Sequence, residues 1–352
     1  MPTVVDPGIV LAGFYPPPFG GESTHVMDLA CRLRATGRLR GIVNLRRGAM
    51  ASPEYVQGAG PRHFCLALAR LLSRDALLHL HTNGHSRRSW GVVSAGSAML
   101  RLRGARGVLT LHSGLAPAFL DGLGRAARGL ARAALAPFQR LVAVNEELRD
   151  ALARLGVPPA RISVVPAFLG LPPDTGDTED TVEAGAAEPL ISVVAGDGPE
   201  YGLPVLLEAL PGLAAAFPGI GCVVVGVHAT PALTGLARRC GVDRRVHFLG
   251  PQPRPRCLAV MRRSALFVRP SLADGDAVSV REALALGISV VASATGTRPP
   301  GVVLFRTGDA GDLAAKISRV LEAGPVTRAP GPSKDFFAEL LGVYRMAAEE
   351  CA

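Results

Sequence analysis

Residues 270–287 read PSLADGDAVSVREALALG, and two acidic residues in this stretch, Asp274 and Glu282, stand eight positions apart. The stretch follows an apolar run at 266–269 that is typical of a buried strand. Asp274 therefore falls in a glycine-containing loop beyond a strand end, and Glu282 falls where apolar residues recur at helical spacing. The two acids are either the N-cap and a surface charge of that helix, or ligands for two parts of one bound molecule.

The composition of the chain predicts a folded α/β protein. It has 352 residues, 48% of them hydrophobic and 19% charged, which is enough for two domains with buried cores. No uninterrupted apolar run reaches about 18 residues, the length that a membrane span requires. The start of the chain has no basic lead and favours a first strand over a signal peptide, and the six cysteines form no CxxC pair. Both features predict a cytoplasmic protein with reduced thiols.

Positive charge is concentrated in the first half of the chain. Residues 1–170 hold 21 Arg and 9 acidic residues, whereas the remainder holds 17 basic and 20 acidic residues. A basic surface suits nucleic acid, an anionic membrane face or an acidic acceptor molecule. Only two of the 38 basic residues are Lys. A general preference for Arg in this sequence is therefore the simpler explanation for most of the individual arginines. We predict no nucleic-acid partner, and peripheral contact of the first half with the inner face of a membrane stays open.

Short apolar runs alternate with helical stretches along the chain, a pattern that predicts parallel, doubly wound sheets. In the first half, the expected strands are 9–15, 41–45, 76–82, 107–112, 140–145 and 161–166. An acidic segment rich in Pro, Gly and Thr then interrupts the alternation, which resumes at residue 190. The predicted organisation is a first domain at 1–168, a linker at 169–189, a second domain at 190–334, and a helix at 335–352 that packs back on the first domain.

The opening stretch resembles the E-x7-E element of the retaining glycosyltransferases of family 4, here in the form D-x7-E. The resemblance covers most of the chain and implies the GT-B fold, in which two Rossmann-like domains with parallel sheets face a central cleft. In that family the first acid contacts the donor hexose, and the second contacts the ribose of the nucleotide. By resemblance, Asp274 and Glu282 take these two roles, with the Asp side chain reaching one methylene less far.

Two segments of the first half also resemble this family. FYPPPFGGESTHVMDLACRL (14–33) looks like its loop between first strand and first helix, where Gly20 and Gly21 let a diphosphate or sugar approach the backbone. LTLHSG (109–114) resembles the segment that carries a histidine near the reacting sugar. His112 is therefore the expected catalytic residue, together with Asp274. A simple tight turn and a structural histidine are the alternative interpretations.

Three histidines form an H-x-H-x3-H pattern at His79, His81 and His85. The first two share one face of a strand, but the third lies beyond a glycine turn, and no carboxylate or Cys accompanies the set. We therefore predict no metal site. The loop after this strand is a candidate acceptor-binding surface, or alternatively a basic, Trp-bearing surface that rests on a membrane. The residues predicted to bind the acceptor are His25, Asn83, His85 and Arg88.

The segment LISVVAGDGPEYGLPV (190–205) departs from the family pattern. Members of the family usually place an Arg and then a Lys here to neutralise the donor diphosphate, whereas this chain has Asp197 and Glu200 near those positions. The leaving diphosphate needs a positive charge for transfer to proceed. Three arginines are candidates for that role, and the last is preferred because it follows a strand end: Arg254, Arg269 and Arg298.

The resulting prediction is a metal-independent hexosyltransferase that needs no cofactor and uses a nucleoside-diphosphate sugar, with UDP as the expected nucleotide. Its acceptor would be a hydroxyl of a glycan, a glycolipid or a natural-product intermediate. The alternative is a catalytically silent GT-B-like protein that binds sugar nucleotides or serves as a partner subunit. A nicotinamide-dependent enzyme is excluded, because GxGxxG is absent after the first strand. The predicted donor-binding residues are Gly20, Gly21, Asp274, Gly275, Asp276, Ala277, Val278, Ser279, Glu282 and Arg298.

Overall fold

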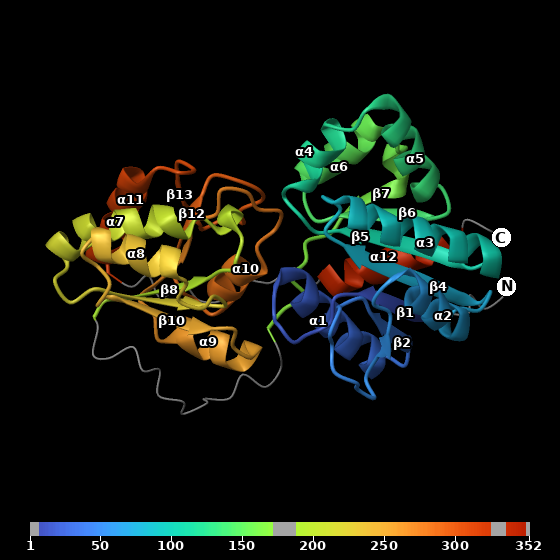
Figure 1. Ribbon diagram of the computed structural model, residues 1–352, viewed down its shortest axis with the longest axis horizontal. Coiled ribbons are helices and arrows are strands. Elements are labelled where there is room, and N and C mark those ends of the chain that lie inside the picture. The colour runs from blue at the N-terminus through green and yellow to red at the C-terminus, as the bar shows by residue number, and fades with distance from the viewer. Residues whose placement is uncertain (1–6, 172–187, 325–335, 350–352) are drawn as a thin grey trace. The chain divides into compact units, whose positions relative to one another are not determined.

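The computed structural model describes residues 7–171, 188–324 and 336–349. They form two compact units, shown in Figure 1. The first unit contains 7–17, 21–169 and 336–349, and the second contains 18–20, 170–171 and 188–324. Most of the predicted linker, residues 172–187, lies outside the described residues, as do 325–335.

The first unit is built on a seven-stranded parallel sheet with the strand order β3-β2-β1-β4-β5-β6-β7. Its strands are β1 (Gly8–Gly13), β2 (Leu39–Asn44), β3 (Val56–Gln57), β4 (Ala76–Thr82), β5 (Arg106–Leu111), β6 (Arg140–Ala143) and β7 (Ile162–Val164). Its helices are α1 (Gly21–Ala35), α2 (Pro61–Leu71), α3 (Arg87–Arg103), α4 (Ala116–Asp121), α5 (Arg125–Leu135), α6 (Glu146–Leu155) and α12 (Phe336–Glu349). The order of strands reverses at β1 and β4, and sheets of this kind bind ligands beyond the carboxyl ends of such strands.

The central strands explain why the first sheet forms. All seven residues of β4, ALLHLHT, are buried, as expected for a parallel strand covered on both faces. Helix α12 covers part of this sheet, because its Leu340, Val343 and Tyr344 share a buried cluster with Ile9 of β1 and Val108 of β5. The C-terminal helix thus belongs to the core of the first unit.

The second unit repeats the plan with a six-stranded parallel sheet in the order β10-β9-β8-β11-β12-β13. Its strands are β8 (Leu190–Val194), β9 (Gly221–Val225), β10 (Val246–Gly250), β11 (Leu266–Arg269), β12 (Val290–Ser293) and β13 (Val303–Phe305). Its helices are α7 (Leu203–Ala216), α8 (Pro231–Arg239), α9 (Arg254–Arg262), α10 (Val278–Ala285) and α11 (Ala310–Glu322). Here the order reverses at β8 and β11, so the loops after these strands are the favoured ligand position.

The sequence prediction of two parallel, doubly wound sheets is confirmed. Among the described helices, none combines the length and the apolar character that crossing a bilayer requires.

Candidate functional site

The candidate donor site of the second unit centres on Asp274, in the loop after β11. Arg269, the last residue of β11, donates from Nε to Asp274 Oδ2 at 2.9 Å and from Nη2 to Oδ1 at 3.2 Å. Arg298, in the loop after β12, donates from Nη1 to Asp274 Oδ2 at 3.0 Å. Two loops at the same edge of one sheet thus bring two guanidinium groups onto one buried carboxylate.

The two arginines keep Asp274 ionised. Burial by itself raises the pKa of Asp274, but the two guanidinium groups more than offset it and hold the pKa below its ordinary value. Asp274 is therefore ionised at neutral pH, and Glu200 and Asp276 lie close enough to act on Arg269 and Arg298 as well. An ionised carboxylate offers about four lone-pair positions, of which the three bonds from arginine fill three. Counting bonds from the described residues, one position on Oδ1 is left to accept a hydroxyl group.

Each arginine is fixed by contacts other than Asp274. Arg269 donates from Nη1 to the Val194 carbonyl at 2.8 Å, and its guanidinium carbon lies 5.0 Å from the centre of the Tyr201 ring, within cation–π distance. Arg298 donates from Nε to the Ser293 carbonyl at 3.0 Å. Tyr201 lies near the position where the family usually has a Lys. In this chain its ring contacts Arg269, the last residue of the neighbouring strand β11.

Two glycines hold the Asp274 loop from opposite ends. Gly202 (φ 66°) and Gly296 (φ 63°) both have left-handed backbone conformations that favour glycine. A Cβ at Gly202 would lie 1.9 Å from the Pro270 carbonyl oxygen, and one at Gly296 would lie 2.3 Å from the Asp274 carbonyl oxygen. The backbone of the loop therefore packs directly against glycine at both places.

Glu282 occupies a second buried ion pair in the same unit. Arg254 donates from Nε to Glu282 Oε1 at 2.7 Å, and the side chains are 5% and 8% exposed. Burial raises the pKa of Glu282, an effect that Arg254 partly counters. Among the described residues Glu282 Oε2 accepts no hydrogen bond, so this carboxylate keeps lone pairs that could receive hydroxyl groups.

The structure overturns the alternative in which the two acids are ordinary helix charges. The N-cap of α10 is Ala277, without a side-chain capping bond, and Asp274 lies three residues before it. Glu282 is 6% exposed and is not a surface charge. The alternative is wrong because Asp274 bonds to residues of two strand ends, and because α10 buries the face that carries Glu282.

The other predicted donor residues lie between these acids. Asp276 pairs with Arg281, which donates from Nε to Oδ1 at 2.7 Å, and Gly275 accepts through its carbonyl from Thr297 N at 2.9 Å. Ala277, Val278 and Ser279 form the entry to α10. These residues are brought together at one strand edge with Asp274 and Arg298.

In the first unit, α1 begins at Gly21, directly after Gly20. Within the part of the chain that the structure describes, a Cβ at Gly21 would meet no atom within 4 Å, so packing there does not require glycine. Glu22, which the sequence analysis did not single out, follows in the first turn. Burial raises the pKa of Glu22 to about 7, an effect that the hydrogen bond from Phe14 N partly counters.

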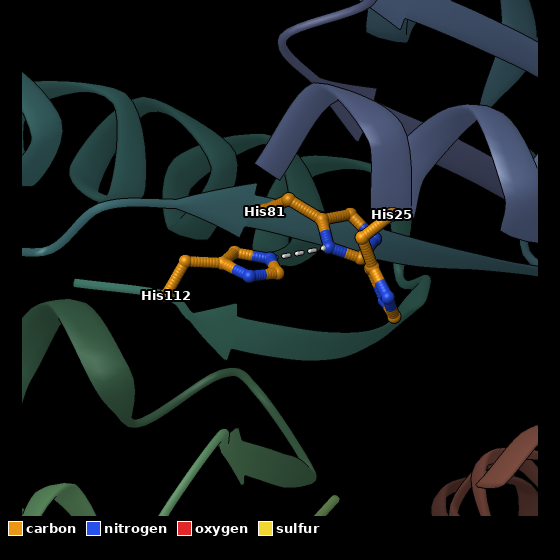
Figure 2. Close-up of side chains that lie close together, drawn as sticks. All are labelled: His25, His81 and His112. Carbon is orange, nitrogen blue, oxygen red and sulfur yellow. Dashed lines mark hydrogen bonds between the residues drawn. The ribbon is translucent and has the colours of Figure 1, made fainter. Parts of the chain in front are cut away.

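Three imidazoles gather at the carboxyl edge of the first sheet: His25 on α1, His81 near the end of β4, and His112 directly after β5 (Figure 2). His81 Nδ1 lies 3.1 Å from His112 Nε2. His25 Nδ1 lies 2.6 Å from the Ala167 carbonyl oxygen. Burial is the main reason that the pKa of all three lies well below the ordinary value, for His25 at about 4.

The histidines of the H-x-H-x3-H pattern do not form one cluster, although the ring centres of His79 and His81 are 4.0 Å apart. His79 Nδ1 lies 2.7 Å from Tyr344 Oη, and His85 Nδ1 lies 2.6 Å from Ser113 Oγ. His81 also meets His25 and His112, a set that sequence spacing could not reveal because each residue comes from a different element.

Of the other residues predicted to bind the acceptor, Asn83 follows β4 and accepts through Oδ1 from His85 N at 3.2 Å. Arg88 is exposed in the first turn of α3. His25 does not join them at this loop, because it is buried on α1 beside His81 and His112.

Both halves of the chain match known families. Residues 19–169 match the family described as Glycosyltransferase Family 4, and residues 188–323 match Glycosyl transferases group 1. D-inositol 3-phosphate glycosyltransferases from Corynebacterium efficiens and Mycobacteroides abscessus are 32% and 30% identical to this chain over 184 and 180 residues. Each match covers 48% of this chain and 43% or 40% of the relative, so the chain spans less than half the length of these curated relatives.

Solved structures with the same fold span the chain almost completely. A glycosyltransferase from Rickettsia africae has a TM-score of 0.71 at 14% identity, covering 98% of this chain and 100% of that one. Anabaena HepE in complex with UDP and glucose has a TM-score of 0.69 at 16% identity, covering 97% and 98%. Sucrose-phosphate synthase from Thermosynechococcus elongatus has a TM-score of 0.68 at 19% identity, covering 96% of each chain. At these identities the likeness establishes the fold.

Proposed function

Because the chain belongs to glycosyltransferase family 4 and has the GT-B fold of two Rossmann-like domains, we propose that it is a retaining glycosyltransferase. It moves a hexose from a nucleoside-diphosphate sugar to an acceptor hydroxyl. The observation that carries this proposal is the buried cluster of Arg269, Asp274 and Arg298, in which two guanidinium groups share one carboxylate at the edge of the sheet. Two guanidinium groups at one strand edge offer a diphosphate charged hydrogen-bond donors, which form the stronger class of hydrogen bond.

The proposed donor contacts follow from the hydrogen bonds that each group can still make. Arg298 and Arg269 take the place of the family's Arg and Lys and bind the diphosphate. Asp274 accepts one hexose hydroxyl through Oδ1. Glu282 accepts the two ribose hydroxyls, for which Oε2 is available. UDP is the proposed nucleotide, supported by the complexes of Anabaena HepE, a neighbour in fold, with UDP and with UDP and glucose.

In the proposed reaction, the bond between hexose C1 and the diphosphate oxygen breaks, and the nucleoside diphosphate leaves with the electron pair. The acceptor oxygen forms its bond to C1 on the same face, which retains the configuration. The acceptor proton passes to the leaving phosphate oxygen. The two arginines stabilise the charge on the leaving group, so that the reaction needs no metal, and His112 hydrogen-bonds the hexose.

The proposed acceptor is a hydroxyl of a saccharide, a glycolipid or a small molecule. The basic first half suits an anionic acceptor, and the matched relatives are D-inositol 3-phosphate glycosyltransferases. We place the protein in the cytoplasm, with peripheral contact at the inner face of a membrane, since its described cysteines are free thiols.

The test is calorimetric titration of the purified chain with UDP, GDP and dTDP and with their hexoses, beside the variant Glu282→Ala. Binding of one nucleotide that the variant loses would support the donor site, and transfer is then assayed as hydrolysis or glycosylation of candidate acceptors. Absence of binding at millimolar nucleotide, with a folded protein, would favour the second candidate. That candidate is a GT-B protein without transfer activity, favoured by the acids Asp197 and Glu200 in the segment where the family has its cations.

A further inference from the structure

The three imidazoles of His25, His81 and His112 are arranged almost symmetrically about one point. Their ring centres are 5.3, 5.3 and 5.4 Å apart. Each ring can offer one nitrogen to an ion, and the three nitrogens lie within 4.8 Å of one another. Figure 2 shows the rings coming from a helix, a strand and the segment after a strand. Three histidines from three different elements can surround one ion, whereas histidines in a row along one strand cannot all face it.

The tautomer of His25 leaves one nitrogen available. A carbonyl oxygen can only accept a hydrogen bond, so the 2.6 Å contact with Ala167 places the proton of His25 on Nδ1. His25 Nε2 therefore keeps its lone pair. A ring N–H donated to a backbone carbonyl is the usual way in which a metal-binding histidine is oriented.

His81 has a buried nitrogen that no described residue satisfies. Its side chain is fully buried, and Nε2 has no hydrogen-bond partner in the part of the chain that the structure describes. When His81 Nδ1 donates to His112 Nε2 across 3.1 Å, the lone pair of His81 Nε2 is left unused and that of His112 Nε2 accepts the bond. His112 can therefore bind an ion through Nε2 only once this hydrogen bond breaks. An unsatisfied buried polar atom costs about 1–3 kcal/mol, which a ligand can recover.

We propose that His25, His81 and His112 bind a divalent transition-metal ion of the Zn²⁺ type, with a fourth position open to water or a small ligand. Three neutral imidazoles with one open position are an established zinc ligand set. Zn–N bonds of about 2.0–2.1 Å in tetrahedral geometry need nitrogens about 3.3 Å apart, so binding draws the three rings together by side-chain rotation. His112, the least buried of the three, is the point of entry.

Binding has a consequence that rests on the proposed function. A nitrogen of His112 that is bound to the ion cannot contact the donor hexose. Zn²⁺ would therefore inhibit transfer, and a chelator would restore it. Because metal binding is measured without substrate, failure of this site and failure of the proposed transferase activity are distinguishable.

The experiment is titration of the chelator-treated full chain with Co²⁺, which absorbs visible light strongly in tetrahedral sites. We expect saturation at one Co²⁺ per chain and displacement by Zn²⁺. The variants His25→Gln and His81→Gln should lose the band, whereas His63→Gln, an exposed histidine of α2, should keep it. Circular dichroism establishes whether each variant is folded.

A second measurement does not depend on variants. X-ray absorption of the zinc-loaded protein should show three imidazole nitrogens at about 2.0–2.1 Å. The proposal is overturned if wild-type protein shows no Co²⁺ band, if the band survives in both buried-histidine variants, or if sulfur scatterers place the metal on a cysteine.

Discussion

Arg298 and Asp274 are separated by 24 positions in the sequence, yet Arg298 Nη1 donates to Asp274 Oδ2 at 3.0 Å, with the side chains 5% and 9% exposed. Arg269 completes the cluster from the end of β11. In this chain the acid assigned to the hexose by family resemblance is thus also the group that positions two cations.

Replacing Asp274 by Ala should destabilise the second unit by about 3–5 kcal/mol, because two buried guanidinium groups lose their shared carboxylate. The only tryptophan, Trp90, lies on α3 of the first unit, so its fluorescence reports that unit alone. We expect thermal unfolding followed by circular dichroism to shift, and the Trp90 transition to stay in place. Asp121→Asn, which breaks an exposed pair with Arg154, should cost about 1 kcal/mol or less. Equal costs for the two variants would contradict the importance of the buried cluster.

Arg298→Gln and Arg269→Gln should each reduce the affinity for UDP about 10- to 100-fold and leave the affinity for uridine unchanged. A hydrogen bond to a charged group contributes about 1.5–3 kcal/mol, and only UDP has the diphosphate. The affinity for uridine serves as the internal control that the pocket is intact. Arg306→Gln, in an exposed residue of the same unit, should change neither affinity. Parallel losses for UDP and uridine would mean that the arginines have a structural role only.

The alternation of strands and helices was predictable from sequence because it depends on local hydrophobicity. β4, β8 and β11 lie within a residue or two of the expected positions, and the parallel order follows from the helices between them. The pairing of Asp274 with Arg269 and Arg298 was not predictable in this way. It depends on how the loops after β11 and β12 turn, which Gly202 and Gly296 determine through close backbone contact.

The capping role considered for Asp274 failed for a related reason. Sequence rules place an N-cap next to the first periodic residue. Here Asp276 pairs with Arg281 and bridges to Thr297, and α10 begins at Val278. The histidine cluster shows the same limit. His81 was recognised within a strand pattern, but its partners are on α1 and after β5, so only the sheet order brings them together.

Glu282 should confer a preference for ribose over deoxyribose. If its carboxylate accepts the ribose hydroxyls, wild-type protein should bind UDP about 10-fold or more tighter than 2′-deoxy-UDP, since each bond to a charged group is worth about 1.5–3 kcal/mol. Glu282→Gln should reduce this preference to within a few-fold. Glu208→Gln, an exposed acid on α7, is the control and should retain it. An unchanged ratio in Glu282→Gln would remove the ribose assignment.

Gly296→Ala should be more damaging than Gly324→Ala, although both positions have left-handed φ values, 63° and 76°. A Cβ at Gly324 meets no atom of the described residues within 4 Å, so that variant is expected to bear only the conformational strain, about 1–2 kcal/mol. At Gly296 the new Cβ meets the Asp274 carbonyl, and such overpacking adds about 1–3 kcal/mol. Unfolding followed by circular dichroism, together with UDP affinity, measures the difference. Similar effects at both positions would show that the Asp274 loop can move without cost.

The stability of the first unit should fall as the pH decreases below about 6.5. His25, His79, His81 and His112 all have a pKa below the ordinary value in the folded chain, mainly because of burial. Between the ordinary value and the folded value, only the unfolded chain binds the proton, so acid favours unfolding. Each such histidine contributes a slope of about 1.4 kcal/mol per pH unit.

Glu22 acts in the opposite direction over part of this range. Its pKa is raised from 4.5 to about 7, so the folded chain binds that proton first, and lowering the pH through this window adds stability. The effect of the four histidines is larger than that of the one carboxyl group. The free energy of unfolding should therefore fall as the pH decreases. Denaturant unfolding followed by Trp90 fluorescence, with a chelator present to keep metal away from the histidines, measures it between pH 7 and pH 4. His25→Asn should lower the slope by about 1.4 kcal/mol per pH unit, and His63→Gln should leave it unchanged. A flat profile in the wild-type protein would mean that the buried imidazoles gain protons without unfolding.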